Sequence, residues 1–327
     1  MGSREPGAPA PAEPVTVIAT VRNEAASIDR LLDSLLSSSR APDEIVIADG
    51  GSTDGTLERL RARAGSEARI HVLVAPGNRS VGRNAAVRAA RNGVIACTDA
   101  GVDVDREWLD RITRPFQDAA VDVVAGFYRP EGETAFERAA GVVSAPRLEE
   151  IDLERFLPST RSVAFRRAAF ERVGGFDEAL WHNEDTPFAL ALKEAGCGFA
   201  FAPDAVVRWR PRGDLRAFMH QHRRFGMGDG ESRVQTWFYT TIAAKYAMAV
   251  ILFVVGFWVR AAWWILGLGV ALFVAMQARR GEGRLSLWER LAGVPALKVA
   301  YDLAYLSGYV KGRLGRPASA RPAPGRS

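Results

Sequence analysis

Residues 43–56 read Asp-Glu-Ile-Val-Ile-Ala-Asp-Gly-Gly-Ser-Thr-Asp-Gly-Thr, and this stretch decides the fold. The apolar, β-branched run Ile45–Ile47 predicts a buried strand. Asp49 follows it, then a glycine-rich turn, and then a helical pattern. Ligands of open α/β sheets bind beyond the carboxyl ends of the strands, so Asp49 is placed to accept hydrogen bonds from a ligand. Taken alone, the stretch fits an ordinary strand–turn–helix connection, capped by Thr53 or Asp54, equally well.

The same alternation of strands and helices continues on both sides. Val15–Thr20, Ile70–Val74 and Val94–Thr98 are further apolar, strand-like runs. Between the first two strands, apolar residues recur at the spacing of one helix face: Ile28, Leu31, Leu32, Leu35 and Leu36. Four strands separated by helices predict an α/β domain with a parallel sheet and right-handed connections.

The second half of this domain, up to residue 232, is less regular. Pro76–Asn84 predicts a polar loop, and residues 130–157 predict a less regular segment that is either mobile or on the acceptor side of a site. Phe199–Pro203 and Ala205–Trp209 predict two short strands. A basic helix carrying His220–Phe225 is expected to end where three closely spaced glycines follow: Gly226, Gly228 and Gly230.

The chain changes character at residues 238–276. Phe238–Val259 carries one charge, Lys245, and Ala261–Met276 carries none. One helix of this length would measure about 60 Å, twice the hydrocarbon thickness of a bilayer, so we expect a transmembrane hairpin. A re-entrant hairpin and a buried core hairpin are the alternatives. An interfacial aromatic and basic cluster marks the expected turn: Trp258, Arg260, Trp263 and Trp264.

Charge is distributed unevenly along the chain. Residues 1–237 hold 31 Lys/Arg and 35 Asp/Glu, whereas residues 238–327 hold 12 Lys/Arg and 3 Asp/Glu. A basic, apolar C-terminal part on a mildly acidic body indicates a membrane partner and no nucleic acid. Arginines after the hairpin predict that both its ends face the cytoplasm. Leu287–Val310 predicts an interfacial amphipathic helix, with a third span left open.

The predicted organisation has four parts. Residues 1–14 form a disordered leader rich in Pro and Ala, and residues 15–232 form the α/β domain. Residues 233–278 contain the hairpin, and residues 279–327 contain the basic juxtamembrane helix and a disordered tail. The two isolated cysteines, Cys97 and Cys197, predict neither a disulfide framework nor a zinc site and suit a reducing compartment.

Three further places carry residues suited to chemistry. Asp99 follows an apolar strand, where it could hold a divalent cation or cap the next helix. Glu184 and Asp185 could supply a general base, although Asp185 also stands where a helix cap should be. Arg223 and Arg224 could bind a phosphate or the headgroups of anionic lipids.

Six segments in this order resemble the family 2 glycosyltransferases: Val15–Glu24, Ile45–Thr56, Gly82–Asn84, Thr98–Gly101, Gly174–Asp177 with Glu184-Asp185, and Gln221-x-x-Arg-Phe225. The resemblance covers roughly residues 14–230. It implies a GT-A fold, which is a Rossmann-like, mostly parallel α/β domain that binds a nucleotide sugar. The C-terminal hairpin resembles that of the bacterial membrane-bound members.

The resemblance also implies roles for residues. Glu184 and Asp185 would be catalytic, with Asp185 as the base that deprotonates the acceptor hydroxyl. The diphosphate and the acceptor would meet Gln221, Arg224 and Phe225. The nucleotide-sugar donor, UDP- or GDP-linked, would be bound by Thr20, Arg22, Asn23, Glu24, Asp49, Gly51, Ser52, Arg83, Asn84 and Asp99.

The chain departs from the family pattern at the metal-binding D-x-D motif, which reads Asp99-Ala-Gly101. Either Asp103 supplies the missing ligand, or a Mg²⁺ or Mn²⁺ ion relies on Asp99 and the donor diphosphate. The resemblance implies an inverting transferase, hexosyl-transferring in type, and the hairpin places its lipid-linked or cell-envelope acceptor at the cytoplasmic membrane face. The alternative is an inactive nucleotide-sugar-binding or scaffold protein in polysaccharide assembly.

Overall fold

The computed structural model describes residues 13–315, so nearly all of the predicted leader and the end of the predicted tail lie outside the described residues. The strands are β1 (Val15–Val21), β2 (Glu44–Asp49), β3 (Ile70–Val74), β4 (Val94–Cys97), β5 (Val102–Val104), β6 (Val123–Pro130), β7 (Val163–Arg166) and β8 (Phe199–Trp209). The helices of the α/β part are α1 (Ile28–Leu36), α2 (Thr56–Ser66), α3 (Arg79–Ala89), α4 (Trp108–Thr113), α5 (Ala135–Ser144), α6 (Arg167–Arg172) and α7 (Asp185–Glu194).

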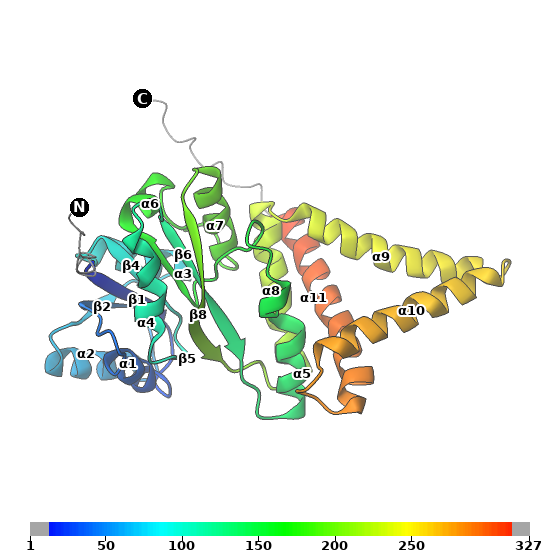
Figure 1. Cartoon of the computed structure of the whole chain (residues 1–327), viewed down its shortest axis with the longest axis horizontal. Helices are drawn as coiled ribbons and strands as arrows, with labels where there is room; N and C mark the ends of the chain where they lie inside the picture. The colour runs from blue at the N-terminus through cyan, green and yellow to red at the C-terminus, as the bar shows by residue number, and fades with distance from the viewer. Residues whose placement is uncertain (1–12, 316–327) are drawn as a thin grey trace, which may run out of the picture. The chain divides into compact units, whose positions relative to one another are not determined.

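The eight strands form one mixed sheet in the order β3-β2-β1-β4-β7-β6-β8-β5 (Figure 1). The predicted parallel arrangement is confirmed for the first four strands, since β1 pairs in parallel with both β2 and β4, and β2 with β3. The sheet then turns antiparallel, because β7 runs against both β4 and β6. The carboxyl ends of β1, β2 and β4 therefore share one edge.

The chain forms two compact units. The first takes in the chain up to Phe127, Leu157–Phe176 and Phe188–Val207; the second takes in Tyr128–Phe156, Asp177–Pro187 and the chain from Arg208. Strands β1, β2 and β4 of the first unit are almost wholly buried, as their continuous apolar runs predict. A cluster of phenylalanines extends this core: Phe165, Phe170, Phe176 and Phe188.

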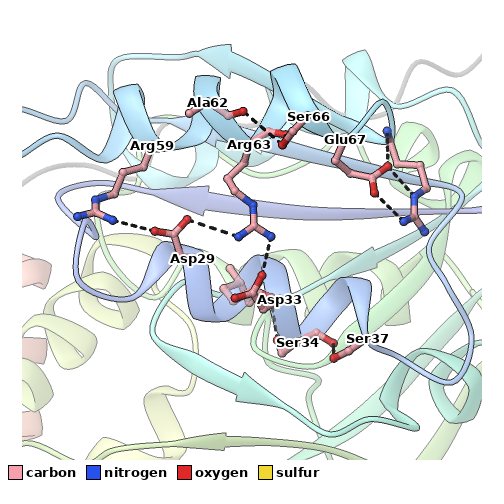
Figure 2. Close-up of polar contacts among 11 residues, drawn as sticks. Asp29, Asp33, Ser34, Ser37, Arg59, Ala62, Arg63, Ser66 and Glu67 are labelled. Atoms are coloured by element: carbon pink, nitrogen blue, oxygen red, sulfur yellow. Dashed lines mark hydrogen bonds and ion pairs between the residues drawn. The ribbon is translucent and has the colours of Figure 1, made fainter.

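Helices α1 and α2 of the first unit are joined by exposed ion pairs (Figure 2). Arg59 contacts Asp29 at 2.9 Å, and Arg63 contacts Asp33 at 2.6 Å. Because these pairs are solvent-accessible, each contributes about 0.2–1 kcal/mol. The buried face of α1, which includes Leu31 and Leu32, contributes more, at roughly 1.5–3 kcal/mol for each fully buried side chain.

Four local expectations were wrong. Helix α3 begins at Arg79, inside the expected loop Pro76–Asn84, because Asn78 caps it by accepting a hydrogen bond from the Val81 N–H. Residues 135–144 form α5, which begins at a capping box between Thr134 and Glu137. Phe199–Trp209 is one continuous strand that accommodates Pro203, in place of two short strands.

The fourth correction concerns the basic helix, α8 (Leu215–Ser232), which continues through all three glycines. These glycines let α8 lie against its neighbours with almost no space between the backbones. A methyl group on Gly226 would overlap the carbonyl oxygen of Tyr305, and one on Gly230 would overlap that of Tyr309. Both tyrosines belong to α11 (Val294–Gly315), whose Gly308 and Gly312 approach α8 in the same way. Figure 1 shows α8 and α11 side by side.

Helices α9 (Thr236–Val255) and α10 (Ala261–Arg280) form a hairpin of two long arms (Figure 1). Both are long and apolar enough to cross a membrane, and only 11% of each apolar window is buried. Such exposure argues against the buried core hairpin. At the turn, Trp258 and Trp264 are 77% and 81% exposed. The expected amphipathic helix corresponds to α11, which follows a short π-helix at Glu289–Gly293.

Candidate active site

Asp49 ends β2 and is fully buried. Its Oδ2 accepts hydrogen bonds from the backbone N–H groups of Gly51 and Ser52, both at 3.0 Å. This turn requires a φ of +85° at Gly51, a conformation that glycine adopts without a steric penalty. The other oxygen, Oδ1, is also buried and has no hydrogen-bond partner among the described residues. Buried acceptors normally have a partner, so Oδ1 is suited to an N–H donor from a ligand.

The loop after β1 is fixed to the glycine-rich turn after β2. The Asn23 N–H donates to Ser52 Oγ at 2.9 Å, and Asn23 Oδ1 accepts from the Thr53 N–H at 2.9 Å. The Glu24 N–H donates to Thr56 Oγ1 at 2.8 Å. These contacts bring together two separate segments of the chain whose residues the sequence had assigned to the same ligand. Arg22, in the same loop, is exposed.

Asp99 follows β4 and contacts the buried guanidinium of Arg83, whose Nη2 donates to Asp99 Oδ1 at 2.8 Å. Burial raises the pKa of Asp99, but the positive charges of Arg83, Arg79 and Arg161 outweigh it and hold the pKa below its usual value. The carboxylate is therefore ionised at neutral pH. Guanidinium groups such as that of Arg83 are well suited to bind a phosphate.

Asp49 ends β2 and Asp99 follows β4, and these two strands flank β1 on either side. Adjacent strands lie about 4.8 Å apart, so β2 and β4 are roughly 10 Å apart across the sheet edge. A nucleoside has about that length. Near the same edge, a methyl group on Gly82 would lie 2.8 Å from Thr20 Cγ2, so α3 packs directly on β1.

The carboxylates near Asp99 fit a divalent cation only in part. Asp103 lies on β5, where its side chain pairs with Arg30 at 2.9 Å. Within residues 13–315, no group of three or more His, Cys, Asp or Glu residues could hold a metal ion. Mg²⁺ is commonly bound through one or two carboxylates together with substrate phosphates, and Asp99 fits that role.

Asn84 has a role inside the first unit. Its Nδ2 donates to the Phe176 carbonyl at 2.8 Å, and its Oδ1 accepts from the Phe176 N–H at 2.9 Å. Its side chain therefore fixes the Gly174–Asp177 turn, which connects two of the segments that carry the family resemblance. Sequence reasoning had placed Asn84 at the donor.

In the second unit, Glu184 is buried and Asp185 opens α7. Asp185 Oδ1 accepts from the Thr186 N–H at 3.1 Å, which agrees with a carboxylate at a helix start. The residue before this pair, Asn183, has a left-handed φ of +54°. Strain of this kind concentrates at functional sites.

The Gln221-x-x-Arg-Phe225 segment lies on α8. Arg224 Nε donates to His182 Nε2 at 3.1 Å, so α8 is bonded to the segment that carries Glu184 and Asp185. Gln221 Oε1 accepts from Arg212 Nε at 3.0 Å. The Phe225 ring lies 6.4 Å from that of Tyr305 on α11, within the helix packing.

Two family models match the chain: "Glycosyl transferase family 2" over residues 16–175 and "Glycosyl transferase family group 2" over residues 150–276. The chain belongs to the family 2 glycosyltransferases. The resemblance read from its six segments is thereby confirmed.

Characterised relatives include glycosyltransferase AglE of Haloferax volcanii, 27% identical over 74% of this chain and 81% of that protein. The succinoglycan biosynthesis protein ExoA of Rhizobium meliloti is 27% identical over 64% of this chain and 67% of its own length. The pre-mycofactocin glycosyltransferase of Mycobacterium tuberculosis is 29% identical over 65% of this chain, which spans only 46% of that protein.

A solved structure shares the fold of this family 2 glycosyltransferase. It is the mannosyltransferase PcManGT from Pyrobaculum calidifontis, in complex with GDP-Man and Mn²⁺. The TM-score is 0.58 at 21% identity, covering 93% of this chain and 88% of the other. The GT-A fold expected from the sequence is confirmed.

Sequence reasoning missed several residues of this glycosyltransferase that the structure places at its polar clusters: Arg79, Arg161, Asn183 and Asp229. Arg79 lay in a stretch assigned to a loop, and Arg161 has no pattern around it that indicates a ligand. Asn183 and Asp229 are 46 residues apart, and only the tertiary structure brings them together.

Proposed function

We propose that this glycosyltransferase transfers a sugar, with inversion at the anomeric carbon, from a nucleotide sugar to an acceptor hydroxyl. The observation that carries the proposal is the edge shared by Asp49 and Asp99. One carboxyl group has a buried, unsatisfied oxygen, and the other contacts the Arg83 guanidinium and is influenced by the charges of Arg79 and Arg161. A nucleoside diphosphate presents matching groups at its two ends.

Asp49 would bind the nucleotide base. Its Oδ1 requires an N–H donor, and both uracil and guanine carry ring N–H groups that could serve. Around it, Thr20, Arg22, Asn23, Glu24, Gly51 and Ser52 would form the rest of the base and ribose site. The mannosyltransferase of similar fold was solved with GDP-Man, which keeps GDP-sugars among the donors to be tested beside UDP-sugars.

The diphosphate would lie against Arg83, together with Arg79 and Arg161. Asp99 would hold a Mg²⁺ or Mn²⁺ ion jointly with the diphosphate, and Asp103 would contribute only if it left Arg30. When bound, such an ion neutralises charge on the leaving diphosphate. Mn²⁺ accompanies the donor in the mannosyltransferase of similar fold.

Asp185 would act as the general base. It would accept the proton of the acceptor hydroxyl while that oxygen forms a bond to the anomeric carbon, and the bond from that carbon to the diphosphate would break. Glu184, Gln221, Arg224 and Phe225 would complete the acceptor side. Asn84 would act indirectly, through the turn that it holds.

A membrane would be the working surface. Helices α9 and α10 would span it as a hairpin, with both ends and the catalytic domain in the cytoplasm, and the acceptor would be lipid-linked or a cell-envelope glycan. A cysteine at Val259, in the hairpin turn, tests this topology, since Cys97 and Cys197 are buried. A membrane-impermeant thiol reagent should label this cysteine from outside intact cells. If the reagent labelled it only after the cells were lysed, the proposed orientation would be contradicted.

The deciding experiment is a donor screen on detergent-solubilised protein with Mg²⁺ or Mn²⁺. We expect release of UDP or GDP from one sugar nucleotide, including hexose donors, when an acceptor lipid is present. Gly101, which replaces the second carboxylate of the metal motif, favours one alternative: a binding protein without turnover. Calorimetry that shows donor binding, with no release over a panel of acceptors, would favour that alternative.

A further inference from the structure

Asn183 is a strained residue directly before the proposed base. Its φ of +54° is tolerated best by Gly, Asn and Asp. Two hydrogen bonds hold its side chain, because Nδ2 donates to Thr186 Oγ1 at 3.1 Å and to Asp229 Oδ1 at 2.5 Å. The second bond reaches from the start of α7 to α8, across 46 residues of sequence.

Asp229 is 2% exposed, and its other oxygen is also bonded. Oδ2 accepts from the Tyr239 hydroxyl at 2.5 Å. Tyr239 belongs to α9, the first arm of the hairpin, and its ring stacks on that of Tyr309 at 3.9 Å. One buried carboxyl group therefore connects the base-bearing segment to the hairpin.

The residue before Asp229 makes a second contact with the same segment. A methyl group on Gly228 would overlap the His182 carbonyl oxygen and would lie 3.0 Å from Asn183 Cβ. The α8 backbone thus touches His182 and Asn183, while the Asp229 side chain holds Asn183 by its amide. Two successive residues of α8 fix the backbone that enters Glu184 and Asp185.

The bonding of Asp229 does not depend on its ionisation. Burial raises the pKa of Asp229 to about 7, with the negative charge of Asp185 adding to this and the bonds from Tyr239 and Asn183 opposing it. The ionised form accepts both bonds. The protonated form can still accept from Asn183 at Oδ1 while donating to the Tyr239 oxygen, since a hydroxyl group is both donor and acceptor.

We propose that Asp229 is a positioning residue for the glycosyl transfer reaction: through Asn183 it holds the backbone at which Asp185 is presented, and through Tyr239 it ties that backbone to α9. This role rests on the proposed function of Asp185 as the base. Asp229 itself touches neither donor nor acceptor in this scheme. A misplacement of about 1 Å in a catalytic group can lower a rate by 10²-fold.

The first test compares Asp229→Leu with Asp229→Asn in the full-length, solubilised protein. Asn keeps an oxygen for Asn183 and offers an N–H to the Tyr239 oxygen, whereas Leu keeps the shape without the bonds. We expect kcat to fall by about 10–100-fold in Asp229→Leu, with the donor KM changed by less than about 3-fold, and to stay within about 3-fold of wild type in Asp229→Asn. Equal losses in both variants, or none in a folded Asp229→Leu, would overturn the proposal.

The second test uses Asn183 and needs no change at Asp229. Asn183→Gly keeps the left-handed backbone and removes the amide, so its loss of kcat should match that of Asp229→Leu. In the double variant the losses should not multiply, because both changes break one connection. Tyr239→Phe should lower kcat less than Asp229→Leu does, because Asp229 keeps its bond to Asn183. Tyr309→Phe is the matched control, since it removes a hydroxyl group that is bonded to Thr236 and not to Asp229. If the losses of kcat in the double variant multiplied, Asp229 and Asn183 would not act through one shared contact.

Hydrogen exchange separates this proposal from the proposed function. Backbone amides of residues 184–187 should exchange faster in Asp229→Leu and Asn183→Gly than in wild type, whether or not any donor is turned over. If wild type releases no nucleotide with any donor, the proposed function fails while the exchange still decides whether Asp229 holds this segment. Unchanged exchange in both variants would overturn the positioning role.

Discussion

The proposed donor edge of the sheet and the segment that carries the proposed base present carboxylates in different ways. At the donor edge, Asp49 is held by backbone N–H groups two and three residues further along the chain. At Asn183–Asp185, the holding groups come from α8 and, through Asp229, from α9. The first arrangement is local and is specified by a short sequence. The second depends on helix packing, so damage far away in sequence should reach it.

The largest expected effect is at the proposed general base. Asp185→Asn should lower kcat by about 10²–10⁴-fold, because the amide cannot accept the acceptor's proton. Donor affinity should remain within a few-fold in calorimetry, since the donor edge is built from other residues. A variant that transferred sugar at the wild-type rate would show that the base is another residue.

The next effect separates local from packed structure. Gly226→Ala should destabilise the protein by about 1–3 kcal/mol, because the methyl group meets the Tyr305 carbonyl in the α8–α11 contact. Gly65→Ala in α2 is the matched control: nothing lies within 4 Å of its added methyl group, and it should stabilise by roughly 0.5–1 kcal/mol. The thermal unfolding midpoints of both variants and of wild type, measured in the same detergent, give the two changes in stability. Equal shifts would mean that α8 and α11 are not in such close contact.

The pH dependence of stability should reveal the buried carboxyl group of the packed region. Because the pKa of Asp229 is about 7 when folded and about 3.8 when unfolded, its stabilising contribution is full below pH 3.8 and is lost as pH rises to about 7. The thermal midpoint of wild type minus that of Asp229→Asn should therefore fall between pH 5 and pH 8. If the difference between the two midpoints stayed constant over this pH range, Asp229 would not be the group that titrates.

The smallest effect is expected at the donor edge. Asp49→Asn keeps an oxygen for the Gly51 and Ser52 N–H groups but turns an NH₂ group toward the base. The ring N–H of the nucleotide base would then face another N–H group, so the affinity for the nucleotide should fall by about 10-fold, while thermal stability should change little. Calorimetry with the nucleoside diphosphate measures it. Unchanged affinity would remove Asp49 from base recognition.

Local sequence was sufficient for much of the α/β part. The strands Val15–Val21 and Glu44–Asp49 were predictable as continuous apolar runs, and the helix from Ile28 was predictable because its apolar residues recur at the spacing of one helix face. The capping box at Thr134 and Glu137 was available as a signal and was not used, which is why α5 was missed. Asp49 and Asp99 were identified because each stands at the carboxyl end of such a strand.

The sequence by itself determined the family, the strand-end carboxylates and the apolar hairpin, because these depend on short segments and their order. Only the tertiary structure decided what the glycines of α8 do, since a glycine that breaks a helix and one that permits close packing look alike in sequence. It likewise decided that the charges of three arginines act on Asp99 and that Asp229 holds Asn183. Those contacts join residues that are distant along the chain, and no local period records them.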